Sequence, residues 1–283
     1  MPSLLDIRRR IRSVKNTQQL TKALKTVSAA KLRRAQERVM SARPYAAQLK
    51  NVLGNLASRI ENVSHPLLEV RSENRVLVIV VTADRGLCGA FNSNVIRSGQ
   101  AFIREHHERE IRVTAIGRKA RDFFRRRVRL HSEFINIFSR LNYGHAKEIS
   151  ERVIEVYNNA EFDSVYIVYN EFKSAIQQRL IVEKMLPFDR GDLQEGQTRV
   201  DYIFEQPPQE IFNRLLPRYI ETQIFRALLE SEASEHGARM AAMDTATRNA
   251  GELIDTLTLN MNRVRQAAIT REIIEVVSGA GAL

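Results

Sequence analysis

The segment TADRGLCGAFN, Thr82 to Asn92, holds the residues of this chain best placed for chemistry. It follows a predicted buried strand, where α/β folds commonly bind phosphates. It contains Gly86 and Gly89 but lacks the third glycine of a dinucleotide fingerprint, and no GxxxxGK followed by Ser or Thr occurs in the chain. We therefore predict a structural strand-to-helix turn and no self-contained ATPase. The loop residues singled out are Asp84, Arg85, Gly86, Cys88 and Gly89.

Cys88 is the single cysteine, so the chain can form no internal disulfide and a reducing compartment is expected. A thiol at a helix N-terminus can be a nucleophile because its pKa falls there. No histidine partner is identifiable from spacing, which favours a small buried residue instead. The six histidines are scattered without metal-ligand spacing. We predict no catalytic residue, no metal site and no cofactor.

Positive charge is concentrated near the N-terminus of a chain whose net charge is +11. Such charge indicates an acidic partner: nucleic acid, anionic lipid or a protein surface. Only Asp6 and Glu37 oppose it on the first predicted helix, and no aromatic residue precedes Tyr45 to stack on a base. A specific acidic protein partner fits better than nucleic acid or a solvated face. The basic residues are Arg8, Arg9, Arg10, Arg12, Lys15, Lys22, Lys25, Lys31, Arg33, Arg34 and Arg38.

The N-terminal region reads as one long helix from Ser3 to about Arg59, which Pro44 is expected to kink. Its apolar residues step by three and four. After the polar patch at residues 16–19, the stepping resumes in a shifted phase, which predicts a local change in coiled-coil winding. The apolar positions after the shift are Leu20, Leu24 and Val27.

The C-terminal region, from Pro217 to about Val277, reads as a second long helix, with Pro217 marking its start or a bend. Sustained steps of three and four predict a coiled coil. Neither end can bury its stripe alone, so we expect the two helices to pack antiparallel. The stepping positions are Met243, Ala246, Ala250, Leu253, Leu257, Asn260, Val264, Ala267, Arg271 and Ile274.

The middle of the chain alternates strands with helices, which predicts a doubly wound α/β domain. The continuous apolar run at 75–81 is typical of a strand buried on both faces. Further strands are expected at 111–116 and 164–170, and an antiparallel edge pair from residues 177–186 and 198–205. The predicted domains are 1–59, an N-terminal coiled-coil helix; 60–207, the central α/β domain; and 208–283, a C-terminal coiled-coil helix.

Three segments together resemble the γ-subunit family of bacterial F-type ATP synthases. They are DIRRRIRSVKNTQQLTKAL with SAAKLRRAQ at 6–36, the loop at 82–92, and the end at 234–249 and 262–280. The resemblance implies that the terminal helices form a rotor shaft inside a hexamer of α and β subunits, with a Rossmann-like α/β domain on its side. The chain would couple ion flow to ATP synthesis and hydrolysis at the α/β sites, and influence ATPase regulation, without being catalytic itself.

The resemblance also implies the partners and their contact residues. The ε subunit and the c-subunit ring are expected at the foot of the shaft. The acidic lever of the β subunit is expected at Lys22, Leu24, Lys25, Arg33 and Arg34. The upper shaft is expected to contact β through Arg265, Gln266 and Thr270. The apical tip, Val277 to Leu283, is expected in an apolar collar.

The chain has no apolar run near the roughly 18 residues of a membrane helix. We expect membrane association through the complex only, as a peripheral protein on the cytoplasmic face of the bacterial inner membrane. The alternative reading is a basic coiled-coil protein that binds nucleic acid. A third reading is an α/β enzyme that uses the Gly86–Gly89 loop.

Overall fold

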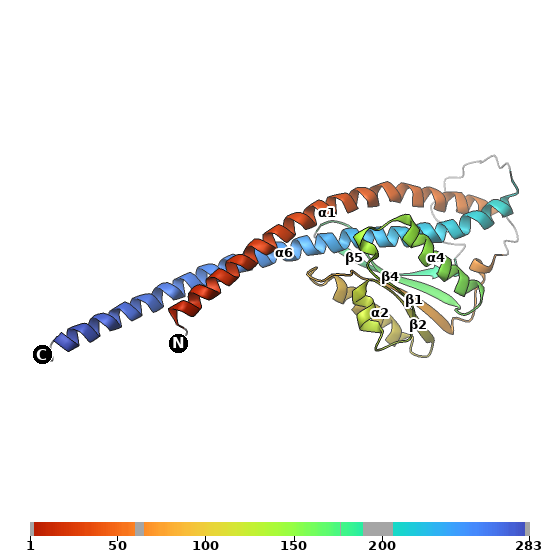
Figure 1. Ribbon diagram of the computed structural model, residues 1–283. Coiled ribbons are helices and arrows are strands. Elements are labelled where there is room, and N and C mark those ends of the chain that lie inside the picture. Colours follow the sequence, from red (N-terminus) through yellow and green to blue (C-terminus); the bar gives the residue numbers. More distant parts are fainter. Residues whose placement is uncertain (1–2, 60–64, 176, 189–205, 281–283) are drawn as a thin grey trace. The chain divides into compact units, whose positions relative to one another are not determined.

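The computed structural model describes residues 3–59, 65–175, 177–188 and 206–280. The chain divides into two compact units: Met1–Ser28 with Arg239–Leu283, and Ala29–Ala238. Two long helices, α1 (Leu4–Arg59) and α6 (Pro208–Ala280), contribute residues to both units (Figure 1). The predicted fold class, an α/β sheet with long coiled-coil helices from the two termini, is confirmed.

The larger unit contains a five-stranded sheet in the order β3-β2-β1-β4-β5. The first four strands in this order run parallel, and β5 pairs antiparallel with β4. The strands are β1 (Arg75–Val81), β2 (Glu110–Ile116), β3 (Leu130–Phe134), β4 (Ser164–Phe172) and β5 (Gln178–Leu186).

Helices cover both faces of this sheet, which explains the continuous apolar run of β1. Val76, Val78 and Val80 pack with residues of α2 (Phe91–Glu105) and α3 (Arg118–Phe124). Alternate residues of a strand point to opposite faces, so Leu77 and Ile79, which are fully buried, face the other side. There lies α4 (Tyr143–Asn158), which Asn142 and His145 begin with a capping box (Figure 1). Two short 3₁₀ turns, η1 (Pro66–Leu68) and η2 (Ile137–Ser139), complete the connections.

The predicted strands at 75–81, 111–116 and 164–170 are present as β1, β2 and β4. The strand β3 was not predicted, because its sequence, LHSEF, has no β-branched run. Residues 177–186 supply β5, whereas the strand expected at 198–205 lies outside the described residues. The domain boundaries at 59/60 and 207/208 stay predictions.

Pro217 does not begin the C-terminal helix, which was one of the two expectations for it; a bend of the helix at Pro217 stays a prediction. The helix α6 starts at Pro208 and continues through Pro217. A proline at the first helical position loses no hydrogen bond, because the first amides of a helix have no intrahelical acceptor. Pro208 is therefore the better start signal of the two.

Candidate functional site: the paired terminal helices

The seam of α1 follows an unbroken heptad pattern from Leu4 to Leu53. The phase shift predicted after residues 16–19 is therefore wrong. Strict alternation of three and four is the geometry of a left-handed coiled coil. The buried or half-buried positions are Leu4, Ile7, Ile11, Val14, Gln18, Thr21, Lys25, Ser28, Leu32, Ala35, Val39, Ala42, Ala46, Leu49 and Leu53.

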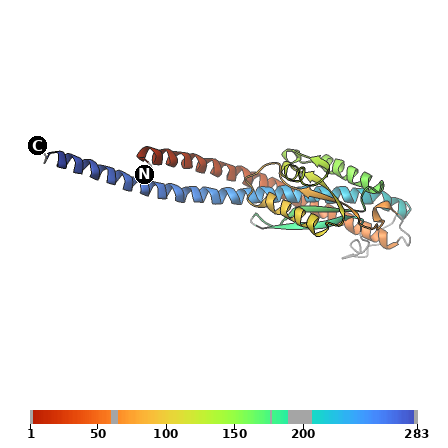
Figure 2. The same cartoon turned by 90° about the horizontal axis from the view of Figure 1, so that it is seen from below.

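Within the smaller unit, the beginning of α1 and the later part of α6 lie side by side (Figures 1 and 2). Their seam is polar at the centre. The hydroxyls of Thr21 and Thr247 are 2.8 Å apart, and Lys25 Nζ lies 2.5 Å from Asp244 Oδ1. The hydrogen bond from Lys25 is the main cause that holds the pKa of Asp244 below its ordinary value. Polar contacts therefore join the two helices here, beside the buried side chains of Met243 and Ala250.

Gly251 lets the two helices approach closely in this segment. A Cβ atom at Gly251 would lie 3.2 Å from Gln18 Nε2. The amide of Gln18 also donates to the Thr247 carbonyl at 3.4 Å. Gly237 of the same helix approaches the backbone of Ala175 instead of a partner helix.

The seam of α6 departs from the predicted heptad positions. Met243, Ala246, Ala250, Leu257 and Val264 are buried or half-buried as expected. In the next turns, however, Ile254, Met261 and Ala268 replace the predicted Leu253, Asn260 and Ala267, which are exposed. Together with the half-buried Thr247, the observed positions still alternate by four and three residues from Met243 to Ala268, so the heptad repeat is kept and its second position lies one residue later than predicted.

The apolar residues that suggested a shifted seam lie outside it. Leu20, Leu24 and Val27 are 65%, 38% and 52% exposed. They form what we call the lateral stripe, and Lys22 beside them is exposed with no ion-pair partner in the described part of the chain. Lys25 points into the seam instead, because Asp244 holds it.

Arg33 and Arg34 are exposed residues of the part of α1 that belongs to the larger unit. Arg33 makes a long contact of 3.4 Å with Glu37 one turn later. Exposed pairs of this kind hold little energy, about 0.5 kcal/mol or less. Both guanidinium groups are therefore available to a partner.

Every residue from Ile269 to Ser278, at the end of α6, is exposed. Arg265, Gln266 and Thr270 lie on its surface, where the Thr270 hydroxyl donates to the Gln266 carbonyl at 2.9 Å. The predicted tip begins in this stretch with an exposed Val277, whereas Leu283 lies outside the described residues. The exposed large apolar side chains here are Ile269, Ile273, Ile274, Val276 and Val277.

The loop after β1 folds upon itself instead of leaving an open anion site. Asn92 accepts a hydrogen bond from the Ala83 amide at 2.9 Å and donates to the Arg85 carbonyl at 3.2 Å. The same amide group contacts the sulfur of Cys88, which is buried, at 3.1 Å. Gly86 has open space beside it, whereas Gly89 adopts a positive φ of 56° that favours glycine.

Asp84 of this loop connects the segments that follow β1, β2 and β3. Its Oδ1 accepts hydrogen bonds from the amides of Arg118, at 3.0 Å, and Asn136, at 2.8 Å. The adjacent Gly117 cannot be replaced, because a Cβ there would lie 2.1 Å from the Thr82 carbonyl oxygen. The carboxylate thus accepts from the first amide of α3, where the helix N-terminus favours negative charge.

Two ion pairs of the larger unit were missed by the sequence reasoning. Arg38 Nη1 lies 2.9 Å from Glu232 Oε2, and Arg38 Nη2 donates to the Leu141 carbonyl at 2.7 Å. Arg43 pairs with Glu230 in the same unit. The signal in the sequence was three glutamates within six residues of α6, at 230, 232 and 235.

Among the described residues, no group of three or more His, Cys, Asp or Glu side chains could hold a metal ion. No helix in the described ranges combines the length and apolarity needed to cross a bilayer.

Known proteins resemble the chain over its whole length. A family model described as ATP synthase matches residues 3–283. The ATP synthase gamma chain of Solibacter usitatus is 55% identical over 287 residues, covering 100% of this chain and 99% of the relative.

Solved structures resemble it as well. The central stalk and c-ring structure of the Tetrahymena thermophila mitochondrial ATP synthase contains a chain with a TM-score of 0.62 and 28% identity, covering 80% of this chain and 99% of that one. A chain of the Euglena gracilis mitochondrial ATP synthase, in its OSCP/F1/c-ring structure, has a TM-score of 0.68 at 19% identity, covering 99% and 94%.

Proposed function

This chain belongs to the family of ATP synthase gamma chains, and on that premise we propose how it acts as the central rotor shaft of an F-type ATP synthase. The shaft couples ion flow through the membrane sector to ATP synthesis and hydrolysis at the α/β sites, and it influences ATPase regulation. The chain itself is not catalytic. The observation that carries the role is the full-length family match, and the antiparallel pairing of the terminal helices agrees with it.

We assign the lateral stripe and Lys22 to contact with the acidic lever of the β subunit. Exposed apolar side chains beside an unpaired cation suit a partner surface that is part apolar and part acidic. Arg33 and Arg34 extend the same positive charge along α1. Lys25 contributes indirectly, because its pair with Asp244 holds the two helices in register.

The other proposed contacts follow from the family membership of the chain. Arg265, Gln266 and Thr270 would contact the β subunit higher on the shaft, and the exposed apolar end of α6 would run in a collar of the α and β subunits. The ε subunit and the c ring would hold the foot. Through them the chain would lie on the cytoplasmic face of the bacterial inner membrane as a peripheral protein.

The nucleic-acid alternative gains no support from the comparisons. The alternative that this chain is an α/β enzyme gains no support from the comparisons either, and in the Gly86–Gly89 loop Asn92 already binds the Ala83 amide and the Arg85 carbonyl. Gel-shift titration with duplex DNA at moderate salt should give only weak, sequence-blind binding.

The decisive measurement is the number of protons pumped per ATP hydrolysed by the assembled complex in membrane vesicles. Lys22→Glu sets like charges against each other at the proposed contact, which can cost several kcal/mol. We expect this variant to lower the pumping ratio more than the rate of hydrolysis, and added salt to restore part of it. The matched control is Lys15→Glu, an exposed cation of the same helix. An unchanged ratio for Lys22→Glu in a fully assembled complex would contradict the assignment.

Lys25 needs a different design because of its partner. Lys25→Glu places two carboxylates together in the seam, so it should disturb the complex through the shaft itself. The exchange Lys25→Glu with Asp244→Lys should restore the pumping ratio. A double variant as defective as Lys25→Glu alone would mean that Lys25 contacts the β subunit directly.

A further inference from the structure

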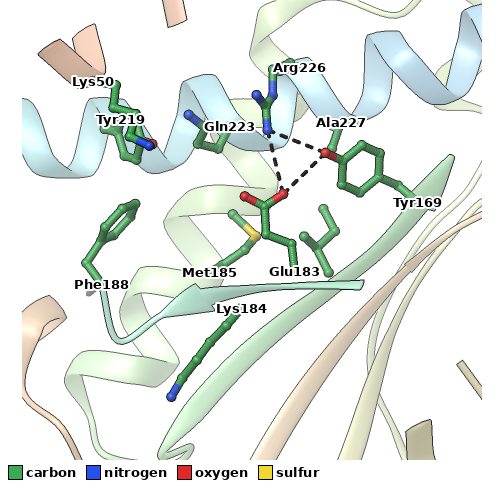
Figure 3. Close-up of a pocket in the computed structure, with 11 residues that line it drawn as sticks. Lys50, Tyr169, Glu183, Lys184, Met185, Phe188, Tyr219, Gln223, Arg226 and Ala227 are labelled. Atoms are coloured by element: carbon green, nitrogen blue, oxygen red, sulfur yellow. Dashed lines mark hydrogen bonds and ion pairs between the residues drawn. The ribbon is translucent and has the colours of Figure 1, made fainter. Parts of the chain in front are cut away.

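A cavity of about 320 Å³ lies in the larger unit between α6, the strands β4 and β5, and Lys50 of α1. Tyr219, Gln223 and Arg226 line it from one face of α6, as their spacing of four and three residues requires. Figure 3 shows these side chains opposite Glu183 and Met185 of β5. This volume is at the lower end of the range for small-molecule sites.

One side of the cavity is apolar. Phe188 and Tyr219 meet edge to face, with ring centroids 4.8 Å apart. Ile167 and Met185, both buried, continue this wall from the sheet. Such a wall suits a compact apolar group, because aromatic rings offer a rigid surface at low entropic cost.

The other side holds a guanidinium with weak internal partners. Arg226 Nη2 lies 3.5 Å from the Tyr169 hydroxyl and 3.7 Å from Glu183 Oε2. Charge-assisted hydrogen bonds are ordinarily about 2.7–2.9 Å long. Its Nε is enclosed and has no hydrogen-bond partner among the described residues. The Arg226 side chain is 33% exposed, and this exposed surface belongs to atoms other than Nε.

The charges that line the cavity leave an excess of one positive charge. Glu183 offsets Arg226, and the ammonium of Lys184 is bound to Glu73. Figure 3 shows that Lys184 points away from α6, so only its stem borders the cavity. Lys50 has no acidic partner in the described part of the chain. A single negative charge on a ligand would balance the site.

We propose that this cavity binds a small organic monoanion, a carboxylate on a compact apolar body. The carboxylate lies against Arg226, whose planar fork matches its two oxygens, and Lys50 contributes the balancing charge. The apolar body packs on Phe188 and Tyr219. A ligand here contacts α1, α6 and the sheet at once, so its binding stabilises the larger unit as a whole.

Benzoate and benzyl alcohol test this proposal on the full chain, because they share the ring and differ in the charge. We expect benzoate to give saturable heat in calorimetric titration and to raise the melting temperature, whereas benzyl alcohol does neither. Arg226→Gln should weaken benzoate binding by about tenfold or more. Arg226→Lys, which keeps the charge but not the fork, should fall between. The matched control is Arg214→Gln, an exposed arginine of the same helix outside the cavity.

Three results would overturn the proposal. The first is the absence of a saturable benzoate signal in the wild-type chain. The second is equal weakening by Arg214→Gln, which would mean general attraction of anions to a basic chain. The third is unchanged binding in Arg226→Gln with native helix content by circular dichroism, which would place the ligand elsewhere.

Discussion

Arg43 and Glu230 form a two-point ion pair that joins α1 to α6 in the larger unit. Nε lies 2.9 Å from Oε1, and Nη2 lies 3.0 Å from Oε2. The same groups hold the end of β4, because Nη2 donates to the Phe172 carbonyl at 3.0 Å and the Phe172 amide donates to Oε2 at 2.9 Å. The Glu230 side chain is 3% exposed. Two helices and the sheet therefore depend on one buried carboxylate and its cation.

Removing Arg43 should destabilise the chain strongly. Arg43→Ala leaves the Glu230 carboxylate buried without its cation. We expect the free energy of unfolding to fall by about 3 kcal/mol. This value is at the low end for a buried ion pair, because Arg43 is partly exposed. Urea unfolding measures it. Adding Glu230→Gln should recover more than half, since the amide oxygen still accepts from Phe172. The exposed Arg33–Glu37 pair is the control, where Arg33→Ala should cost about 0.5 kcal/mol or less. Equal costs at the two sites would refute the argument.

The second ion pair predicts a dependence on pH. Burial raises the pKa of Glu232 above its ordinary value, Glu235 adds to this, and Arg38 and Lys31 oppose it. Because the folded-state pKa is the higher one, the contribution of Glu232 to stability falls as pH rises through that pKa. Arg38→Met should raise the pKa further, so its cost should grow from acid to neutral pH.

The Arg38→Met series is measured by urea unfolding at several pH values. Adding Glu232→Gln removes the titrating group, and the growth of the cost with pH should then disappear. A cost that is independent of pH in the Arg38→Met chain would mean that Arg38 acts through its hydrogen bond to the Leu141 carbonyl alone.

The register of the coiled coil can be tested with a disulfide. In a Cys88→Ser background, cysteines at Thr21 and Thr247 should oxidise readily, because the two hydroxyls are 2.8 Å apart. Non-reducing electrophoresis after mild oxidation detects the faster-migrating, cross-linked chain. The pair Leu24→Cys with Leu257→Cys is the control and should stay reduced, because Leu24 lies in the lateral stripe outside the seam. Cross-linking of the control alone would show a different register.

Gly251 and Gly237 of α6 should respond oppositely to replacement by alanine. Gly251→Ala gains helix propensity of up to about 1 kcal/mol, and its new methyl group meets only the movable end of Gln18. In Gly237→Ala the methyl group would lie 3.1 Å from the Ala175 carbonyl oxygen, a backbone atom that cannot move aside. We expect a higher melting temperature for the first variant and a lower one for the second. A rise in both would mean that the Ala175 segment yields at little cost.

The sequence identified most elements because their patterns were strong. The apolar run of β1, rich in β-branched residues, predicted a strand buried on both faces, and helices do cover both faces of the sheet. The seam of the coiled coil was harder to predict from the sequence. The apolar residues Leu20 and Leu24 suggested seam positions, whereas the polar residues Thr21 and Lys25 occupy them. Polar residues can occupy the seam positions of a heptad when they form hydrogen bonds or ion pairs with the opposite helix, as Thr21 and Lys25 do.

The long-range pairs could not be predicted. Asp244 follows Lys25 by 219 residues and Glu230 follows Arg43 by 187, so no local spacing links either pair. The same is true of Asp84, whose two amide donors, Arg118 and Asn136, are brought to it by the topology of three parallel strands. The contact residues for the β subunit, ε subunit and c ring remain predictions from the family resemblance.

Asp84 also gives this edge of the α/β domain a negative charge of its own. Its carboxylate is bound by the amides of Arg118 and Asn136, which follow β2 and β3. An anion that approached these two amides would have to displace the carboxylate and would be repelled by its charge. The same side chain therefore joins three loops and disfavours a phosphate at this place.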